Sequence, residues 1–82
     1  MTTPAKRILA DLTDLLHDIF VRPDLVVTPQ TSAADVSGWD SMKQIDINIA
    51  VEERYAIRLT SREIDAIRNV GDLIDLIERK TS

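Results

Sequence analysis

Residues 38–42 read Gly-Trp-Asp-Ser-Met and stand where an irregular stretch ends and a regular apolar pattern begins. The pattern continues to Ala56, and its apolar side chains recur at the spacing of an α-helix. Asp40 and Ser41 are both residue types that cap helix N-termini, so either side chain can accept a hydrogen bond from the first amides. The stretch therefore predicts a helix over about residues 41–56 with a polar side chain at its start.

The apolar residues of this predicted helix lie on two opposite sides, at about 100° of rotation per residue. One side consists of Ile47, Val51 and Tyr55, and the other of Met42, Ile45 and Ile49. Only one side is needed for the core. The second side could be covered by another helix of the bundle, or it could be a surface for partners and cargo. We favour the partner surface, because acidic residues surround it. These acidic residues are Asp46, Glu52 and Glu53.

A first amphipathic helix is predicted over about residues 4–21. Thr3 followed by Pro4 fits a cap with proline at the first helical position, and one apolar stripe follows. The stripe consists of Ile8, Leu9, Leu12, Leu15, Leu16, Ile19 and Phe20. Pro23 ends this helix, because proline disfavours the helical conformation in the residue before it. The stretch from Pro23 to Asp40 shows no period and predicts a long loop, a length that is often functional.

Two shorter helices complete the chain. The segment Thr-Ser-Arg-Glu at residues 60–63 fits a capping box and opens a helix over about residues 61–67. Asn69 is placed to cap a last helix over about residues 70–80. The prediction is an all-α protein, a four-helix bundle with a long first loop and a short third helix. Its 82 residues suffice for a single domain, 1–82.

Composition narrows the possible functions. The formal charge of −4 and the pI near 4.7 argue against nucleic acid, because an acidic surface repels a phosphate backbone. The chain has no cysteine and no apolar run long enough to span a membrane, which indicates a cytoplasmic protein. We expect a monomer.

Ser41 admits two interpretations. Residues 41–44 themselves form a capping-box pattern, in which the serine hydroxyl would only bond the amide of Gln44. If Asp40 caps the helix instead, the Ser41 hydroxyl is free. A free hydroxyl in the first turn lies beside unpaired amides and the positive end of the helix dipole, which suits an attached phosphate. The residues alone leave both interpretations open.

Three segments in register resemble the acyl carrier protein family. They are Gly-Trp-Asp-Ser-Met at 38–42 with Ile-Asp-Ile at 45–47, Glu-Glu-Arg-Tyr at 52–55, and Asn-Val-Gly-Asp-Leu-Ile at 69–74. The resemblance implies that Ser41 carries 4′-phosphopantetheine, taken from coenzyme A, with Asp40 and Met42 beside it at the cofactor site. The arm's thiol would hold an acyl or aminoacyl group as a thioester. The chain would then be a carrier and not an enzyme.

The resemblance also implies partners: a phosphopantetheinyl transferase, an acyl- or aminoacyl-loading enzyme, and a downstream synthase or transferase. The expected partner-binding residues are Trp39, Met42, Lys43, Ile45, Asp46, Ile49, Glu52 and Glu53. The expected cargo pocket lies between the second and third helices, lined by Ile45, Ile49, Ile64 and Ile67. Met42 stands where leucine is usual. Trp39 and Lys43 depart from simple fatty-acid carriers, which favours a specialised lipid, polyketide or secondary-metabolite pathway.

Other functions have less support. The alternative is a helical interaction module that docks a partner through its Met42 to Ile49 face and receives no prosthetic group. The carboxylates of the second helix lie in no predicted cleft, so we interpret them as a solvated face that steers basic partners. His17 is the only histidine, and no zinc-ligand spacing accompanies it, so we assign no metal site.

Overall fold

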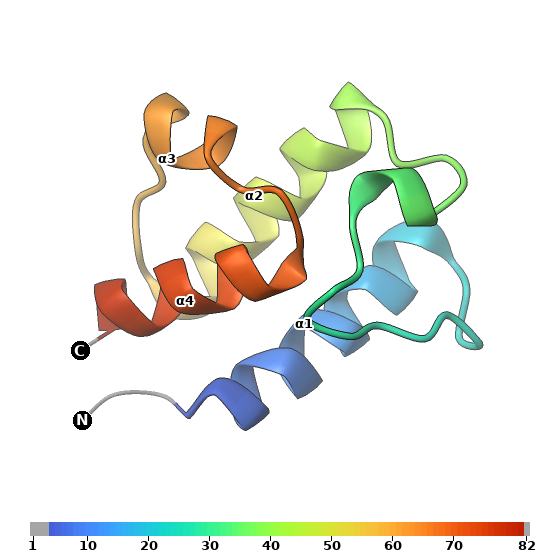
Figure 1. The fold of residues 1–82 in the computed structure, drawn as a ribbon, viewed down its shortest axis with the longest axis horizontal. Coiled ribbons are helices and arrows are strands. Elements are labelled where there is room, and N and C mark those ends of the chain that lie inside the picture. Colours follow the sequence, from blue (N-terminus) through green and yellow to red (C-terminus); the bar gives the residue numbers. More distant parts are fainter. Residues whose placement is uncertain (1–3, 82) are drawn as a thin grey trace.

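The computed structural model describes residues 4–81, and the regular elements within that range are all helical (Figure 1). Their bounds are α1 Ala5–Phe20, η1 Ala33–Asp35, α2 Ser41–Tyr55, α3 Ser61–Asp65 and α4 Val70–Thr81. The predicted all-α class, with a long first loop and a short third helix, is confirmed. The cap expected at Thr3 lies outside the described residues, and the residue before α1 is Pro4.

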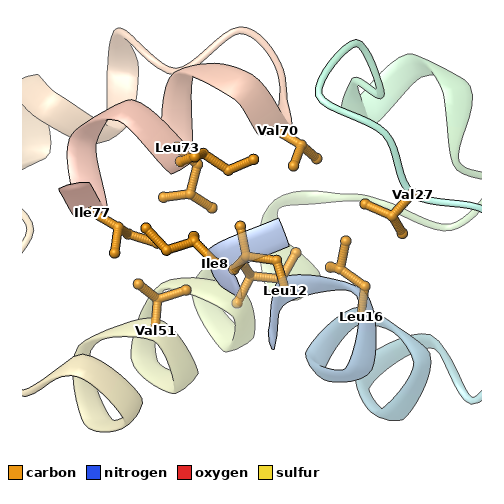
Figure 2. Packing of buried hydrophobic residues seen from close by; sticks show 10 residues of the cluster. Ile8, Leu12, Leu16, Val27, Val51, Val70, Leu73 and Ile77 are labelled. Atoms are coloured by element: carbon orange, nitrogen blue, oxygen red, sulfur yellow. The ribbon is translucent and has the colours of Figure 1, made fainter. Parts of the chain in front are cut away.

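The core lies where α1 packs against both α2 and α4 (Figure 2). Its most buried members are Ile8, Leu12 and Leu16 of α1, Ile47 and Val51 of α2, and Val70, Leu73, Ile74 and Ile77 of α4. Burying a side chain of this kind stabilises the fold by about 1.5–3 kcal/mol. Of the two apolar sides predicted for α2, the one with Ile47 and Val51 faces the core.

α1 ends at Phe20 because Val21 adopts the left-handed conformation, with φ 52°. A left-handed residue commonly ends a helix, although a β-branched residue rarely takes that role. Beyond it, the Arg22 N–H donates back to the His17 carbonyl at 3.0 Å. The His17 ring then donates from Nε2 to the Leu25 carbonyl at 2.6 Å. His17 thus ties the start of the long loop to the end of α1.

The long loop is also held against the start of α4. The Val70 N–H donates to the Thr31 carbonyl and the Gly71 N–H to the Pro29 carbonyl, both at 2.8 Å. These amides belong to the first turn of α4 and have no acceptor within the helix. Thr31 is buried, and its hydroxyl accepts a hydrogen bond from the Thr28 N–H at 2.9 Å. The loop is therefore part of the packed fold.

Within this loop the structure has a short 3-10 turn, η1, where the sequence pattern predicts no regular element. A capping box forms it: Asp35 Oδ2 accepts from the Ser32 N–H at 3.0 Å and from the Ser32 hydroxyl at 3.1 Å. Val36 follows and is buried. The turn brings an apolar side chain of the loop into the interior.

Both predicted caps of the later helices are confirmed. Thr60 Oγ1 accepts from the Glu63 N–H at 3.2 Å, and the Glu63 carboxylate accepts from the Thr60 N–H at 2.9 Å. Asn69 Oδ1 accepts from the Asp72 N–H at 2.9 Å and caps α4. α3 is shorter than the predicted 61–67, because its hydrogen-bonded helix stops at Asp65.

Candidate functional site

The start of α2 is capped by Asp40. Gly38 turns the chain toward the helix with φ 89°, a conformation that glycine adopts without strain. Asp40 Oδ1 then accepts a hydrogen bond from the Lys43 N–H at 3.0 Å. The Gln44 N–H, which a capping Ser41 would need, donates to the Asp40 carbonyl at 3.0 Å instead. The structure therefore agrees with the interpretation in which Asp40, and not Ser41, caps the helix.

Ser41 is consequently the first residue inside α2, and it is exposed. Among the residues that the structure describes, no hydrogen bond involves its hydroxyl. The first amides of a helix lack intrahelical acceptors, and the dipole makes this end positive. A phosphate esterified to the hydroxyl would lie close to these amides, where anions are stabilised. The local structure therefore fits a phosphate-linked prosthetic group at Ser41.

Trp39, expected at a partner surface, is half-buried against the core. Its Nε1 donates to Gln44 Oε1 at 2.9 Å, and its ring centroid lies 5.7 Å from that of Phe20. Gln44 Nε2 in turn donates to Asn48 Oδ1 at 2.9 Å, so the Asn48 side chain points along α2 toward Gln44. The indole is thus fixed between the C-terminal end of α1 and the first turn of α2.

Lys43, also expected at a partner surface, reaches back to α1. Its Nζ donates to the Ile19 carbonyl at 3.1 Å and lies 5.8 Å from the centre of the Phe20 ring. Carbonyls at a helix C-terminus carry partial negative charge and are stabilised by a nearby cation. The ammonium therefore joins α1 to the start of α2, two residues beyond Ser41.

The outer side of α2 exposes its apolar residues to solvent. Met42 is 75% exposed, Ile45 56% and Ile49 49%, and these three residues define what we call the outer face. Asp46 and Glu53 on the same helix are exposed as well. An apolar stripe with acidic neighbours is therefore available on the helix that Ser41 begins.

Glu52 differs from the other acidic residues predicted around this face. It is half-buried, and its Oε2 accepts a hydrogen bond from the Leu59 N–H at 2.9 Å. The carboxylate therefore holds the connection between α2 and α3. Its negative charge remains near the surface, but one oxygen is engaged within the fold.

A cavity lies on the inner side of α2, away from the predicted cargo pocket. It is lined by Leu12, Leu16, Ser32, Ala33, Trp39, Gln44, Ile47, Ile67, Arg68, Asn69, Val70 and Leu73. Of the four residues expected to hold cargo, only Ile67 lines it, while Ile45 and Ile49 are exposed on the outer face. Helical periodicity could not show this, because the cavity walls come from distant segments. Ile64 of α3 is half-buried but does not line the cavity.

No group of three or more acidic, histidine or cysteine side chains within residues 4–81 is placed to hold a metal ion. In the same range, no helix combines the length and apolar character needed to cross a membrane. His17 is engaged with the Leu25 carbonyl, as described above.

Comparison with known proteins agrees with this geometry. Residues 9–77 match the family described as the phosphopantetheine attachment site. The chain is 27% identical over 81 residues to an acyl carrier protein of Acidothermus cellulolyticus, covering 99% of this chain and 96% of that protein. It is 24% identical over 79 residues to a meromycolate extension acyl carrier protein of Mycolicibacterium aurum, covering 96% and 81%. The solution NMR structure of a holo acyl carrier protein from Geobacter metallireducens superposes with a TM-score of 0.84 at 34% identity, covering 89% and 84%.

The fold and the match define the class: a carrier domain with a phosphopantetheine attachment site. The chain belongs to the acyl carrier protein family and is a carrier without catalytic activity. When bound, the 4′-phosphopantetheine arm supplies a thiol that holds the cargo as a thioester. Membership implies a phosphopantetheinyl transferase and the enzymes of a pathway as partners.

Proposed function

We propose that Ser41 is the residue that accepts 4′-phosphopantetheine. The observation that carries this proposal is the division of roles at the start of α2: Asp40 caps the helix, and the neighbouring hydroxyl is exposed and unbonded within the described residues. In the transfer, the serine oxygen forms a bond to the pantetheine-bearing phosphorus of coenzyme A. The bond from that phosphorus to the adenosine bisphosphate breaks, and the hydroxyl proton is lost.

Intact mass spectrometry after incubation with coenzyme A and a broad-specificity phosphopantetheinyl transferase tests this directly. The wild type is expected to gain one phosphopantetheine group, and Ser41→Ala to gain none. Ser37→Ala is the matched control, because Ser37 is an exposed serine four residues away and should leave modification intact. A wild type that stays unmodified with several transferases would instead support the helical interaction module without a prosthetic group.

The outer face, with its acidic neighbours, is proposed to dock the transferase and the loading and downstream enzymes. Met42, Ile45 and Ile49 are exposed beside the attachment serine, and Asp46 and Glu53 can steer basic partners. Glu52, Lys43 and Trp39 act more indirectly in this proposal, because each is engaged inside the fold.

Substitutions on this face separate docking from folding. Ile45→Ala and Ile49→Ala are expected to lower kcat/KM of the transferase while the urea midpoint changes little, because both side chains are exposed. Arg79→Ala on α4 is an exposed control that should leave kcat/KM unchanged. Equal kcat/KM values for all three variants and wild type would exclude this face as the docking surface.

We also propose a specialised lipid, polyketide or secondary-metabolite pathway in the cytoplasm, where coenzyme A supplies the arm. The support is the Trp39 and Lys43 pair at the start of α2 and the similarity to carriers named for meromycolate extension. If the Lys43 charge discourages generic fatty-acid enzymes, Lys43→Glu should raise loading by a fatty-acid malonyl transferase, with Lys43→Met as the neutral control. Unchanged rates at low salt in both folded variants would contradict this role.

A further inference from the structure

A groove open to solvent lies between α3 and α4, and the site at the start of α2 does not use it. One wall is a side of α4 with Asp72, Leu76 and Arg79, which are spaced by three or four residues and so lie on one side of the helix. The other wall is α3 with the connection that follows it, and it includes Arg62, Ile67 and Arg68. We call this feature the α3–α4 groove.

The α3–α4 groove has an apolar floor, and its two walls are tied together. Leu76 is only 3% exposed, although it is not a member of the main core cluster, and Ile67 is half-buried. Lys80 Nζ of α4 donates to Glu63 Oε1 of α3 at 2.9 Å, and the same oxygen accepts from the Thr60 N–H at 2.9 Å. A groove whose walls are already held apart in this way costs less to occupy than one that must form on binding.

Both walls carry arginine side chains that the fold leaves available. Arg62 and Arg79 are exposed, and within residues 4–81 neither side chain forms a hydrogen bond or an ion pair. Arg68 is paired with Asp72 at 3.0 Å, but its side chain is 83% exposed, so this pair exchanges easily for another. Asp75 is the one lining carboxylate without such a bond in the same range. The groove therefore has spare positive charge in a chain whose formal charge is −4.

This combination fits carboxylates that flank an apolar side chain. A guanidinium binds a carboxylate through two parallel N–H bonds, and arginine beside apolar surface is typical of protein interfaces. A nucleic acid does not fit, because the carboxylates of Glu63, Asp72 and Asp75 line the same groove and repel closely spaced phosphates. An acidic peptide segment with an apolar residue matches both the charge and the floor.

We propose that the α3–α4 groove docks an acidic segment of a partner protein, with its apolar side chain over Leu76 and its carboxylates at Arg62 and Arg79, while Ser41 stays accessible. Figure 1 shows the end of α4 and the start of α2 on opposite sides of the molecule. One protein can therefore hold the carrier at this groove while another reaches the start of α2. The proposal does not depend on modification of Ser41, so the two can fail separately.

An NMR titration of the unmodified chain tests the groove. The probe is the blocked peptide acetyl-Glu-Glu-Leu-Glu-Glu-amide, and its control has glutamine in place of each glutamate. The acidic peptide is expected to shift the backbone amide signals of Ala66, Ile67 and Leu76 in a saturable way at low salt. The signals of Ile45 and Ile49 on the outer face should stay in place. Shifts at the groove that are absent, or no larger than those with the glutamine peptide, would overturn the proposal.

Arginine variants test the assigned contacts. Arg62→Gln and Arg79→Gln are each expected to weaken binding about two- to fivefold at low salt, the range of an exposed ion pair. Their urea midpoints should stay near that of the wild type, because both side chains are exposed. Arg22→Gln is the matched control, since it removes the same charge from an exposed position in the long loop, outside the groove. Equal weakening in all three variants would show an effect of net charge alone and contradict the site.

Two more measurements separate this docking from other occupants and from the attachment reaction. Saturating acidic peptide should leave the rate of Ser41 modification by the transferase unchanged, and a slower rate would contradict the separate position of the groove. If no mass is gained even without peptide, the proposed attachment fails and the titration result stands by itself. Groove signals that shift with protein concentration alone would show that a second copy of the chain occupies the groove, against the proposal.

Discussion

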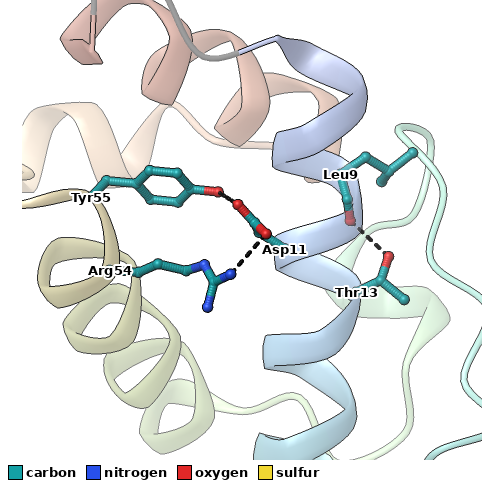
Figure 3. Close-up of polar contacts among 5 residues, drawn as sticks. All are labelled: Leu9, Asp11, Thr13, Arg54 and Tyr55. Atoms are coloured by element: carbon teal, nitrogen blue, oxygen red, sulfur yellow. Dashed lines mark hydrogen bonds and ion pairs between the residues drawn. The ribbon is translucent and has the colours of Figure 1, made fainter.

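The Tyr55 hydroxyl donates a 2.8 Å hydrogen bond to Asp11 Oδ2, joining the last residue of α2 to the first half of α1 (Figure 3). Arg54 Nη2 donates to the other carboxylate oxygen at 2.8 Å. Burial alone would raise the pKa of Asp11, but these two hydrogen bonds and the Arg54 charge outweigh it and lower that pKa. The carboxylate therefore fixes the C-terminal end of α2 to α1.

Asp11→Ala is expected to lower the free energy of unfolding by about 1–3 kcal/mol, because the Tyr55 hydroxyl loses its acceptor in a partly buried position. Urea unfolding followed by circular dichroism measures this. Asp14→Ala on the same helix is the control, and it should cost less than about 0.5 kcal/mol because Asp14 is exposed. Equal losses in both variants would show that the Asp11 contacts add no stability.

The same contacts predict a dependence of stability on pH at both extremes. The lowered pKa of Asp11 means that its contribution is present above its ordinary pKa and is lost as the pH falls through the folded value. Burial, followed by the hydrogen bond to Asp11, raises the pKa of Tyr55 to about 12. Its contribution is complete below about pH 10 and lost as the pH rises toward about 12.

Urea unfolding midpoints measured from acid to alkaline pH check both the acid loss due to Asp11 and the alkaline loss due to Tyr55. Tyr55→Phe is expected to remove the alkaline loss due to Tyr55 while the Arg54 bond to Asp11 preserves part of the acid loss. If Tyr55→Phe loses as much stability at alkaline pH as the wild type does, that loss comes from groups other than Tyr55.

Gly71→Ala is expected to destabilise the protein by about 1–3 kcal/mol, although alanine is the better helix former. The added Cβ would lie 3.0 Å from the Pro29 carbonyl oxygen, which cannot retreat without lengthening the 2.8 Å bond from the Gly71 N–H. Thermal unfolding compares it with Asp75→Ala, an exposed position on the same helix. A Gly71→Ala variant more stable than wild type would contradict the close approach of loop and helix.

Lys43→Met is expected to cost about 0.5–1.5 kcal/mol, because the Ile19 carbonyl loses a donor while the aliphatic contact remains. Lys43→Glu should cost more, because it places a negative charge at the negative end of the α1 dipole. Urea unfolding at low and high salt checks the order. If the two variants were equally stable at low salt, the ammonium would have no electrostatic role there.

Much of the fold was predictable because its signals are local. The apolar stripe of α1, the two sides of α2, and the caps at Thr60 and Asn69 depend on residues within one or two turns of each other. Hydrogen bonds and side-chain spacing at that range follow from helix geometry alone. The same local reasoning named Ser41 as the candidate hydroxyl and Asp40 as its competitor for the cap.

The sequence by itself determined the helices, the outer face of α2 and the serine at its start. Tertiary structure decided what depends on segments far apart: the loop bonded to α4 through Val70 and Gly71, the inward Trp39, and the engaged Lys43. It also placed the cavity on the inner side of α2, between helices and loop. Helix periodicity reports only on residues a few positions apart. Contacts between distant segments depend instead on how whole helices and loops pack against one another in a close-packed interior.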